Sequence, residues 1–212
     1  MAKKAKKQQP GDERYKFLTG LFILLLAIYI TLAFSSFFFT WKSDQSFQWG
    51  EVVSNASITV ENWAGKFGAR LANLFIAQWF GIAYYLIPFF LVILAFRLFR
   101  IRLLPVKKTL QYALLGTIVL SLMLGYLFQD MNGFLINGPG GGHGLIMARW
   151  LNALIGKTGT AFLLIIVITA FILSLVRRPL DDIRQSFQWM GKGLVAFKFK
   201  KPALEKAASP ES

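Results

Sequence analysis

One segment of the chain, residues 137–160, carries glycines followed by a lysine and a threonine, and reads NGPGGGHGLIMARWLNALIGKTGT. Residues of these types can bind a nucleotide phosphate, in the pattern G-x-x-x-x-G-K-[S/T] between a strand and a helix. Gly156, Lys157 and Thr158 match the end of that pattern, but its first glycine would stand at the position of Leu151. We therefore interpret the glycines as turn formers, because glycine adopts positive φ without steric cost.

Residues that could bind a metal or act as acid and base are few. His143 is the only histidine, and the chain has no cysteine to complete a metal site beside it. Asp44, Glu51 and Glu61 are scattered singly, whereas a general acid and base must converge in one pocket. We therefore predict that His143 and these carboxylates are solvated loop residues, with no catalytic residue, no metal site and no cofactor.

The composition indicates a membrane protein. Of the 212 residues, 55% are hydrophobic and 21 are Phe, and 24 Lys and Arg against 10 Asp and Glu give a net charge of +14. A chain this apolar and this basic is typical of a membrane protein with basic ends rather than a nucleic-acid-binding globule.

Four apolar segments are long enough to cross about 30 Å of hydrocarbon as helices. They are residues 17–39, 71–96, 109–128 and 159–176, and none contains a charged residue. The first is longer than the apolar part of a cleavable signal peptide, so we interpret it as a retained anchor. We predict an all-α membrane protein, with a kink at Pro88 in the second span.

The remaining segments are assigned from their composition. Residues 1–16 form a basic cytoplasmic N-terminus, and residues 145–156 form a short amphipathic helix at the membrane surface before span four. Residues 179–201 form an amphipathic juxtamembrane segment, which lies against an anionic inner leaflet or packs on the helix bundle. Residues 202–212 begin a disordered linker, because their composition turns to Ala, Lys, Glu, Ser and Pro.

Small residues within the spans indicate helix packing rather than transport. Gly20, Gly116 and Gly125 allow close helix approach. Transport paths usually require ionisable residues inside the membrane, and the predicted spans have none. A small transporter or channel remains the alternative reading, and a membrane-embedded enzyme is a third.

Motifs at four places along the chain point to one family. They are the following sets: Ser36, Phe37 and Asp44 after span one; Asn62, Gly65, Gly68 and Ala69 before span two; Phe80, Gly81, Ala83, Tyr84 and Pro88 within it; and Gly141, Gly142 and Gly144 before span four. In this order they resemble the N-terminal four-span membrane domain of the FtsK/SpoIIIE family of DNA translocases, over roughly residues 17–178. Pro88 stands one residue late, and the last glycines are spaced one residue more closely than in the family pattern.

The resemblance implies a role as a membrane anchor. Family members tether a hexameric ATP-driven DNA pump at the division septum of the bacterial inner membrane, and their membrane domain helps to hold the division machinery together. The expected partners are the lipid bilayer, other division proteins and further copies of the full-length protein. We expect the motor to lie beyond residue 212, so that this chain alone is not an enzyme. We expect no direct DNA binding, because topology already accounts for the positive charge. Trp49, Trp63 and Trp150 are the expected contacts of the outer loops with partners.

The distribution of Lys and Arg predicts that both termini are cytoplasmic. Nineteen of the 24 lie in the N-terminal flank, the loop between spans two and three, and the C-terminal flank, and five lie in the other two loops. Reporter fusions after residues 60, 103, 145 and 200 should therefore alternate out, in, out, in. An outward reporter at 103 or 200 would contradict the four-span topology.

Overall fold

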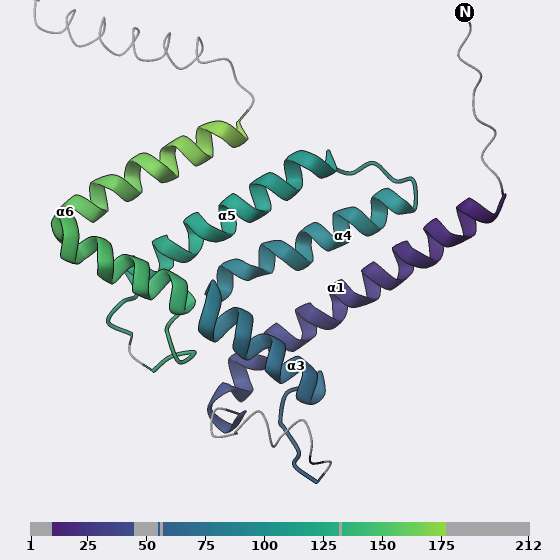
Figure 1. Cartoon of the computed structure of the whole chain (residues 1–212), viewed down its shortest axis with the longest axis horizontal. Helices are drawn as coiled ribbons and strands as arrows, with labels where there is room; N and C mark the ends of the chain where they lie inside the picture. Colours follow the sequence, from purple (N-terminus) through teal and green to yellow (C-terminus); the bar gives the residue numbers. More distant parts are fainter. Residues whose placement is uncertain (1–9, 45–54, 56, 132, 177–212) are drawn as a thin grey trace, which may run out of the picture. The chain divides into compact units, whose positions relative to one another are not determined.

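The structure is a computed structural model that describes residues 10–44, 55, 57–131 and 133–176 (Figure 1). The elements are α1 (Pro10–Asp44), α3 (Gly65–Ala72), the π-helix η1 (Asn73–Trp79), the 3₁₀-helix η2 (Gly81–Tyr85), α4 (Leu86–Leu98), α5 (Val106–Leu127) and α6 (Gly141–Leu175). Residues 1–171 form one unit and residues 172–212 a second. The predicted amphipathic segment 179–201 and the linker 202–212 lie outside the described residues.

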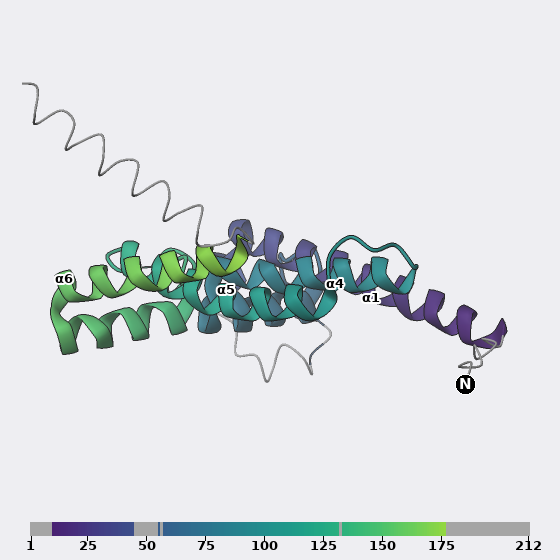
Figure 2. The ribbon, with the colours of Figure 1, turned by 90° about the horizontal axis from the view of Figure 1, so that it is seen from above.

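Four helices are long and apolar enough to cross a membrane: Glu13–Asp44, Gly81–Leu98, Val106–Leu127 and Gly141–Leu175. Over the described ranges there is no β-strand, only an isolated bridge. The 22 residues of α5 reach about 33 Å, which matches the hydrocarbon thickness. The predicted all-α membrane fold with four spans is therefore confirmed. Helix α4 packs against both α1 and α5, so these three lie side by side (Figures 1 and 2).

The second span differs from the predicted range 71–96. The chain leaves the helical conformation at Phe80 and turns at Gly81, so the spanning helix begins at Gly81. The preceding apolar residues instead belong to α3 and η1, which run at an angle to α4 (Figure 1). Their hydrophobicity serves burial against α1, since Ile76 and Ala77 are fully buried there. Pattern alone does not distinguish an apolar segment that crosses lipid from one that packs on protein.

The break in this region also falls elsewhere than predicted. Pro88 stands in the first turn of α4, where a missing N–H group costs least, and its side chain is fully buried. The kink lies eight residues earlier, at Phe80, which follows the π-helix. There the N–H of Phe80 donates to the carbonyl of Phe75 at 3.1 Å, five residues back.

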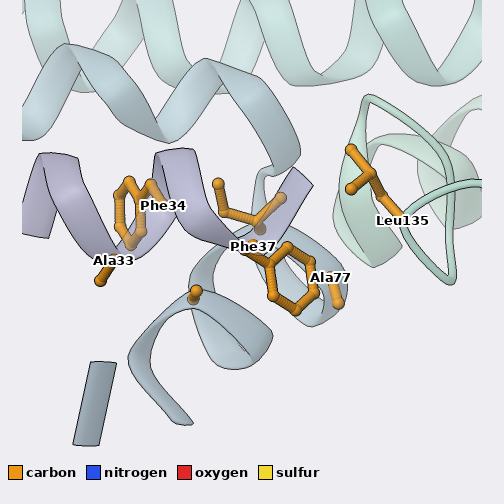
Figure 3. Packing of buried hydrophobic residues seen from close by; sticks show 7 residues of the cluster. Ala33, Phe34, Phe37, Ala77 and Leu135 are labelled. Carbon is orange, nitrogen blue, oxygen red and sulfur yellow. The ribbon is translucent and has the colours of Figure 1, made fainter. Parts of the chain in front are cut away.

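The buried core lies where α1, η1 and the loop before α6 meet (Figure 3). Phe34 and Phe37 project from α1, and Phe37 lies beside Ala77 of η1. Leu135 enters the same core from the loop, at a φ of 50° that non-glycine residues rarely adopt. Burial of its side chain offsets this local strain.

Helix α6 is interrupted at Gly156, where φ is 76° and ψ is 162° (Figure 1). The part before the break contains residues 145–155 of the predicted amphipathic piece 145–156. The part after it covers most of the predicted span 159–176. The hydroxyl of Tyr126, near the end of α5, donates to the carbonyl of Lys157 at 3.0 Å. This bond places the start of the last span beside the end of the third.

Replacement of Gly156 by Ala should destabilise the fold, because its backbone conformation is essentially restricted to glycine. No atom lies within 4 Å of the position an added methyl group would take, so strain alone would act. We expect a loss of about 1–3 kcal/mol, seen as a fall of several degrees in the melting temperature in detergent. Thr158→Ala is the matched control, because Thr158 is exposed and helical, and it should leave the melting temperature nearly unchanged. An equal effect of both substitutions would contradict the assigned role of Gly156.

Candidate functional site

The motif glycines before span four meet the turn at the start of span two. Together with α5 they form a set of backbone contacts that we call the glycine junction: Gly81, Gly125, Gly140, Gly141, Gly142 and Gly144. The junction joins three segments that lie far apart in the sequence.

The first side joins Gly81 to the loop before α6. Both Gly81 and Gly141 have a φ of +67°. A methyl group on Gly81 would overlap the carbonyl oxygen of Pro139 and would lie 2.6 Å from the nitrogen of Gly141. That carbonyl accepts a hydrogen bond from the N–H of Ile82 at 2.9 Å. Side chains are therefore excluded here because backbone pairs directly with backbone.

The second side joins α5 to the first turn of α6. A methyl group on Gly125 would overlap the backbone of Gly144, and one on Gly144 would overlap the carbonyl of Ser121. The hydroxyl of Ser121 is fully buried and donates to the carbonyl of Gly140 at 2.8 Å. The close helix approach predicted at Gly125 is therefore present, and its partner is Gly144 of α6.

The third side attaches α6 and its loop to η1. A methyl group on Gly142 would overlap the carbonyl of Gln78. The side-chain amide of Asn137 donates to the carbonyl of Ala77 at 2.9 Å. Ala77 lies in the last turn of η1, where carbonyls lack an intrahelical partner, and the amide of Asn137 satisfies this one.

His143 lies within the junction rather than in a solvated loop as predicted. It is half-buried in the first turn of α6, with its ring centroid 4.7 Å from that of Phe80. Its Nδ1 lies 3.4 Å from the hydroxyl of Ser121. No group of three His, Cys, Asp or Glu that could hold a metal occurs in the part of the chain that the structure describes. The neighbours of His143 are those of a packing residue.

A second cluster of motif residues holds the segment before α3 against the end of α1; we call it the polar clasp, formed by Ser36, Asp44 and Asn62. The side-chain amide of Asn62 donates to the carbonyl of Ala33 at 3.0 Å, and its oxygen accepts from the N–H of Ala64 at 3.0 Å.

The other two clasp residues bind the same segment. The hydroxyl oxygen of Ser36 accepts from the N–H of Trp63 at 2.9 Å, and a carboxylate oxygen of Asp44 accepts from the N–H of Glu61 at 3.0 Å. Asp44 is only 3% exposed, so the prediction of a solvated carboxylate is wrong for this residue. Glu61 is exposed, and Glu51 lies outside the described residues.

The clasp explains the small residues of α3. A methyl group on Gly68 would overlap the side chain of Ala64 and lie 3.2 Å from that of Ala33. Ala69 is fully buried in the same contact. Gly65 has a φ of +67° with open space around it, so it serves the turn that starts α3.

The remaining motif residues pack between the clasp and the junction. Tyr84 stacks on Phe75 with ring centroids 4.3 Å apart and also lies 6.2 Å from Phe80. Pro88 is buried four residues further along the chain, in α4. The structure thus brings the motif residues into two adjoining clusters whose polar groups hydrogen-bond to backbone.

Sequence reasoning did not identify Ser121, Asn137 and Gly140 as members of the site. Ser121 is a polar residue of the apolar span three, and Gly140 extends the glycine run 140–142 by one residue. A serine one turn before Gly125 on the same helix face was the available signal. No local sequence signal marks Asn137, because its hydrogen-bond partner Ala77 is 60 residues away.

Four helices long and apolar enough to cross a membrane define this chain as a helical multi-pass membrane domain. Residues 13–188 match the family described as the 4TM region of DNA translocase FtsK/SpoIIIE, and since the match covers more than half of the chain, the chain belongs to this family. The matched region is the membrane domain and not the ATPase motor. No curated protein matches the chain. No solved structure matches it either.

Two glycines of α5 provide a matched test of the junction. Gly125→Ala should destabilise the fold by about 1–3 kcal/mol or more, because the methyl group meets the backbone of Gly144. Gly116→Ala should be close to neutral. Its nearest neighbours are ends of side chains, Leu86 Cδ1 at 3.0 Å and Phe171 Cζ at 3.1 Å, and alanine favours the helix by about 1 kcal/mol. The melting temperatures of both variants are measured in detergent. A larger fall for Gly116→Ala than for Gly125→Ala would refute the role of the glycine junction.

Proposed function

We propose that this chain is the membrane-anchoring and septum-assembly domain of a bacterial cell-division DNA translocase. It tethers a cytoplasmic ATP-driven DNA pump used in chromosome segregation, and does not itself hydrolyse ATP. It resides in the inner membrane at the division septum, in contact with other division proteins and with further copies of the full-length protein. The single observation that carries the proposal is the family match over residues 13–188.

The use of polar groups in the interior supports an anchor. Buried Ser36, Asn62 and Ser121 all hydrogen-bond to backbone groups of a neighbouring segment. Thr117 and Thr160 bond to backbone carbonyls of their own helices at 2.7 and 3.0 Å. Such bonds fix helix positions and leave these groups committed to packing, whereas a transport path needs polar groups available to a substrate.

An aromatic surface beside the polar clasp supports partner binding on the predicted outer side. Trp63 stacks on Phe39 with centroids 5.8 Å apart, and the two residues are 60% and 75% exposed. Phe67, 65% exposed, stacks on Tyr29 at 6.4 Å. The clasp fixes Trp63 through its backbone, so these rings form a preorganised surface of the kind that anchors protein contacts. Trp150 is also exposed, and Trp49 lies outside the described residues.

A fluorescent fusion of residues 1–212, expressed in dividing bacteria without any motor attached, should gather at the division site. The double variant Trp63→Ala/Phe67→Ala should lower the ratio of septal to lateral fluorescence at least twofold, because both exposed rings are removed. Gly65→Val/Gly68→Val should weaken the gathering as well, since the added side chains distort the segment held by the clasp.

The matched control is Leu114→Ala/Leu115→Ala on α5, whose side chains are 49% and 54% exposed. It removes two exposed apolar side chains away from the clasp and should leave the ratio unchanged. Membrane insertion of all variants is checked by resistance to alkaline extraction. A wild-type fusion spread uniformly around cells whose other septal proteins localise normally would overturn the proposal.

A further inference from the structure

A cavity of about 580 Å³ opens at the turn between α4 and α5. Three cationic side chains line it: Arg97 from the last turn of α4, Arg102 from the turn, and Lys107 from the first turn of α5. All three residues are exposed. Neither the family match nor the proposed anchoring role assigns anything to this cavity.

The hydrogen bonds that end α4 set the shape of the turn. The N–H of Ile101 donates to the carbonyl of Phe96 at 2.9 Å, and the N–H of Arg100 to that of Arg97 at 3.1 Å. This pair of bonds is the Schellman motif, which requires a left-handed residue after the helix. Arg100 occupies that position with a φ of 68°. The motif therefore folds the chain back so that Arg102 and Arg97 line one cavity.

Within the described part of the chain, no carboxylate neutralises the charges of the cavity. Glu13 pairs with Arg100, which does not line the cavity. Among the described residues no ion pair joins a carboxylate to Arg97, Arg102 or Lys107. The adjoining first turn of α5 contains no acidic residue and no side-chain cap, so its partial positive charge adds to the same field. The cavity therefore favours an anion.

The apolar part of the lining indicates which anion. Leu103 and Leu104 complete the cavity and are 52% and 46% exposed. The turn connects two spanning helices, so it lies at the membrane surface, where the ester and phosphate groups of lipids are found. Exposed leucines beside arginines suit a ligand that carries both a phosphate group and acyl chains. Acyl chains would cover these leucines continuously with the surrounding lipid, which a soluble phosphate or a nucleic acid does not do.

We propose that this cavity is a binding site for an anionic phospholipid of the leaflet on the predicted cytoplasmic side. Arg97, Arg102 and Lys107 contact the lipid phosphate, and Leu103 and Leu104 pack against the upper acyl chains. The site enriches anionic lipid around the turn relative to zwitterionic lipid.

The full chain in nanodiscs provides the test. Because the chain has no cysteine, Ile101→Cys gives a unique attachment point for a fluorophore beside the cavity but outside its lining. Brominated phosphatidylglycerol should quench this label at least twofold more than brominated phosphatidylcholine at the same mole fraction. Arg97→Gln/Arg102→Gln should bring the ratio close to one, and Lys107→Gln should lower it in part.

Arg14→Gln/Lys108→Gln is the matched control, because it removes the same charge from exposed residues on the same predicted side, outside the cavity. It should keep the wild-type ratio. Equal quenching by both lipids in the wild type would overturn the proposal, as would an equal loss in the control, which would indicate general surface charge. Competition by inorganic phosphate or by short duplex DNA would reassign the site to a soluble anion or to nucleic acid.

Discussion

Helices in a bilayer gain little from hiding apolar side chains from one another, since lipid tails are equally apolar, and close packing must hold them together instead. Around α5 and the start of α6, that packing is contact between backbones. Gly125 against Gly144, and Gly81 against the loop ending at Gly141, bring main chains together at distances that no side chain permits. The positions of η1, α5 and α6 within their common unit all depend on these contacts.

A second requirement follows from the same environment: each backbone polar group that leaves its helix must find a partner within the protein. The break at Phe80, the π-helix before it and the loop before α6 all expose such groups. The hydrogen bond from Ile82 to Pro139, the Asn137 amide and the Ser121 hydroxyl satisfy carbonyls at these places. The polar clasp does the same at the end of α1. Irregular backbone and polar side chains therefore occur together in this domain.

These dependencies explain what the sequence could predict. The four apolar segments are local signals, so the number of spans was correct from composition alone. The order of the motif residues was sufficient to indicate the family. The start of the second span was wrong because the turn at Gly81 is held by Pro139, which lies 58 residues later. That Asn62 would reach Ala33, or that Gly142 would meet Gln78, depends on long-range packing that no local pattern encodes.

The long separation between Gly81 and Pro139 has a consequence for how the domain is made. The chain is synthesised from its N-terminus at about 5–20 residues per second, so the partner of Ile82 emerges roughly 3–12 s after Ile82 itself. During that interval α1 is available, and the clasp residues Ser36 and Asp44 can already hold the segment before α3. By contrast, the N–H of Ile82, in the turn that leads into α4, lacks its acceptor until Pro139 in the loop before α6 has been synthesised. During biogenesis the segment before α3 can therefore dock before the junction, which closes only after residue 139 has been made.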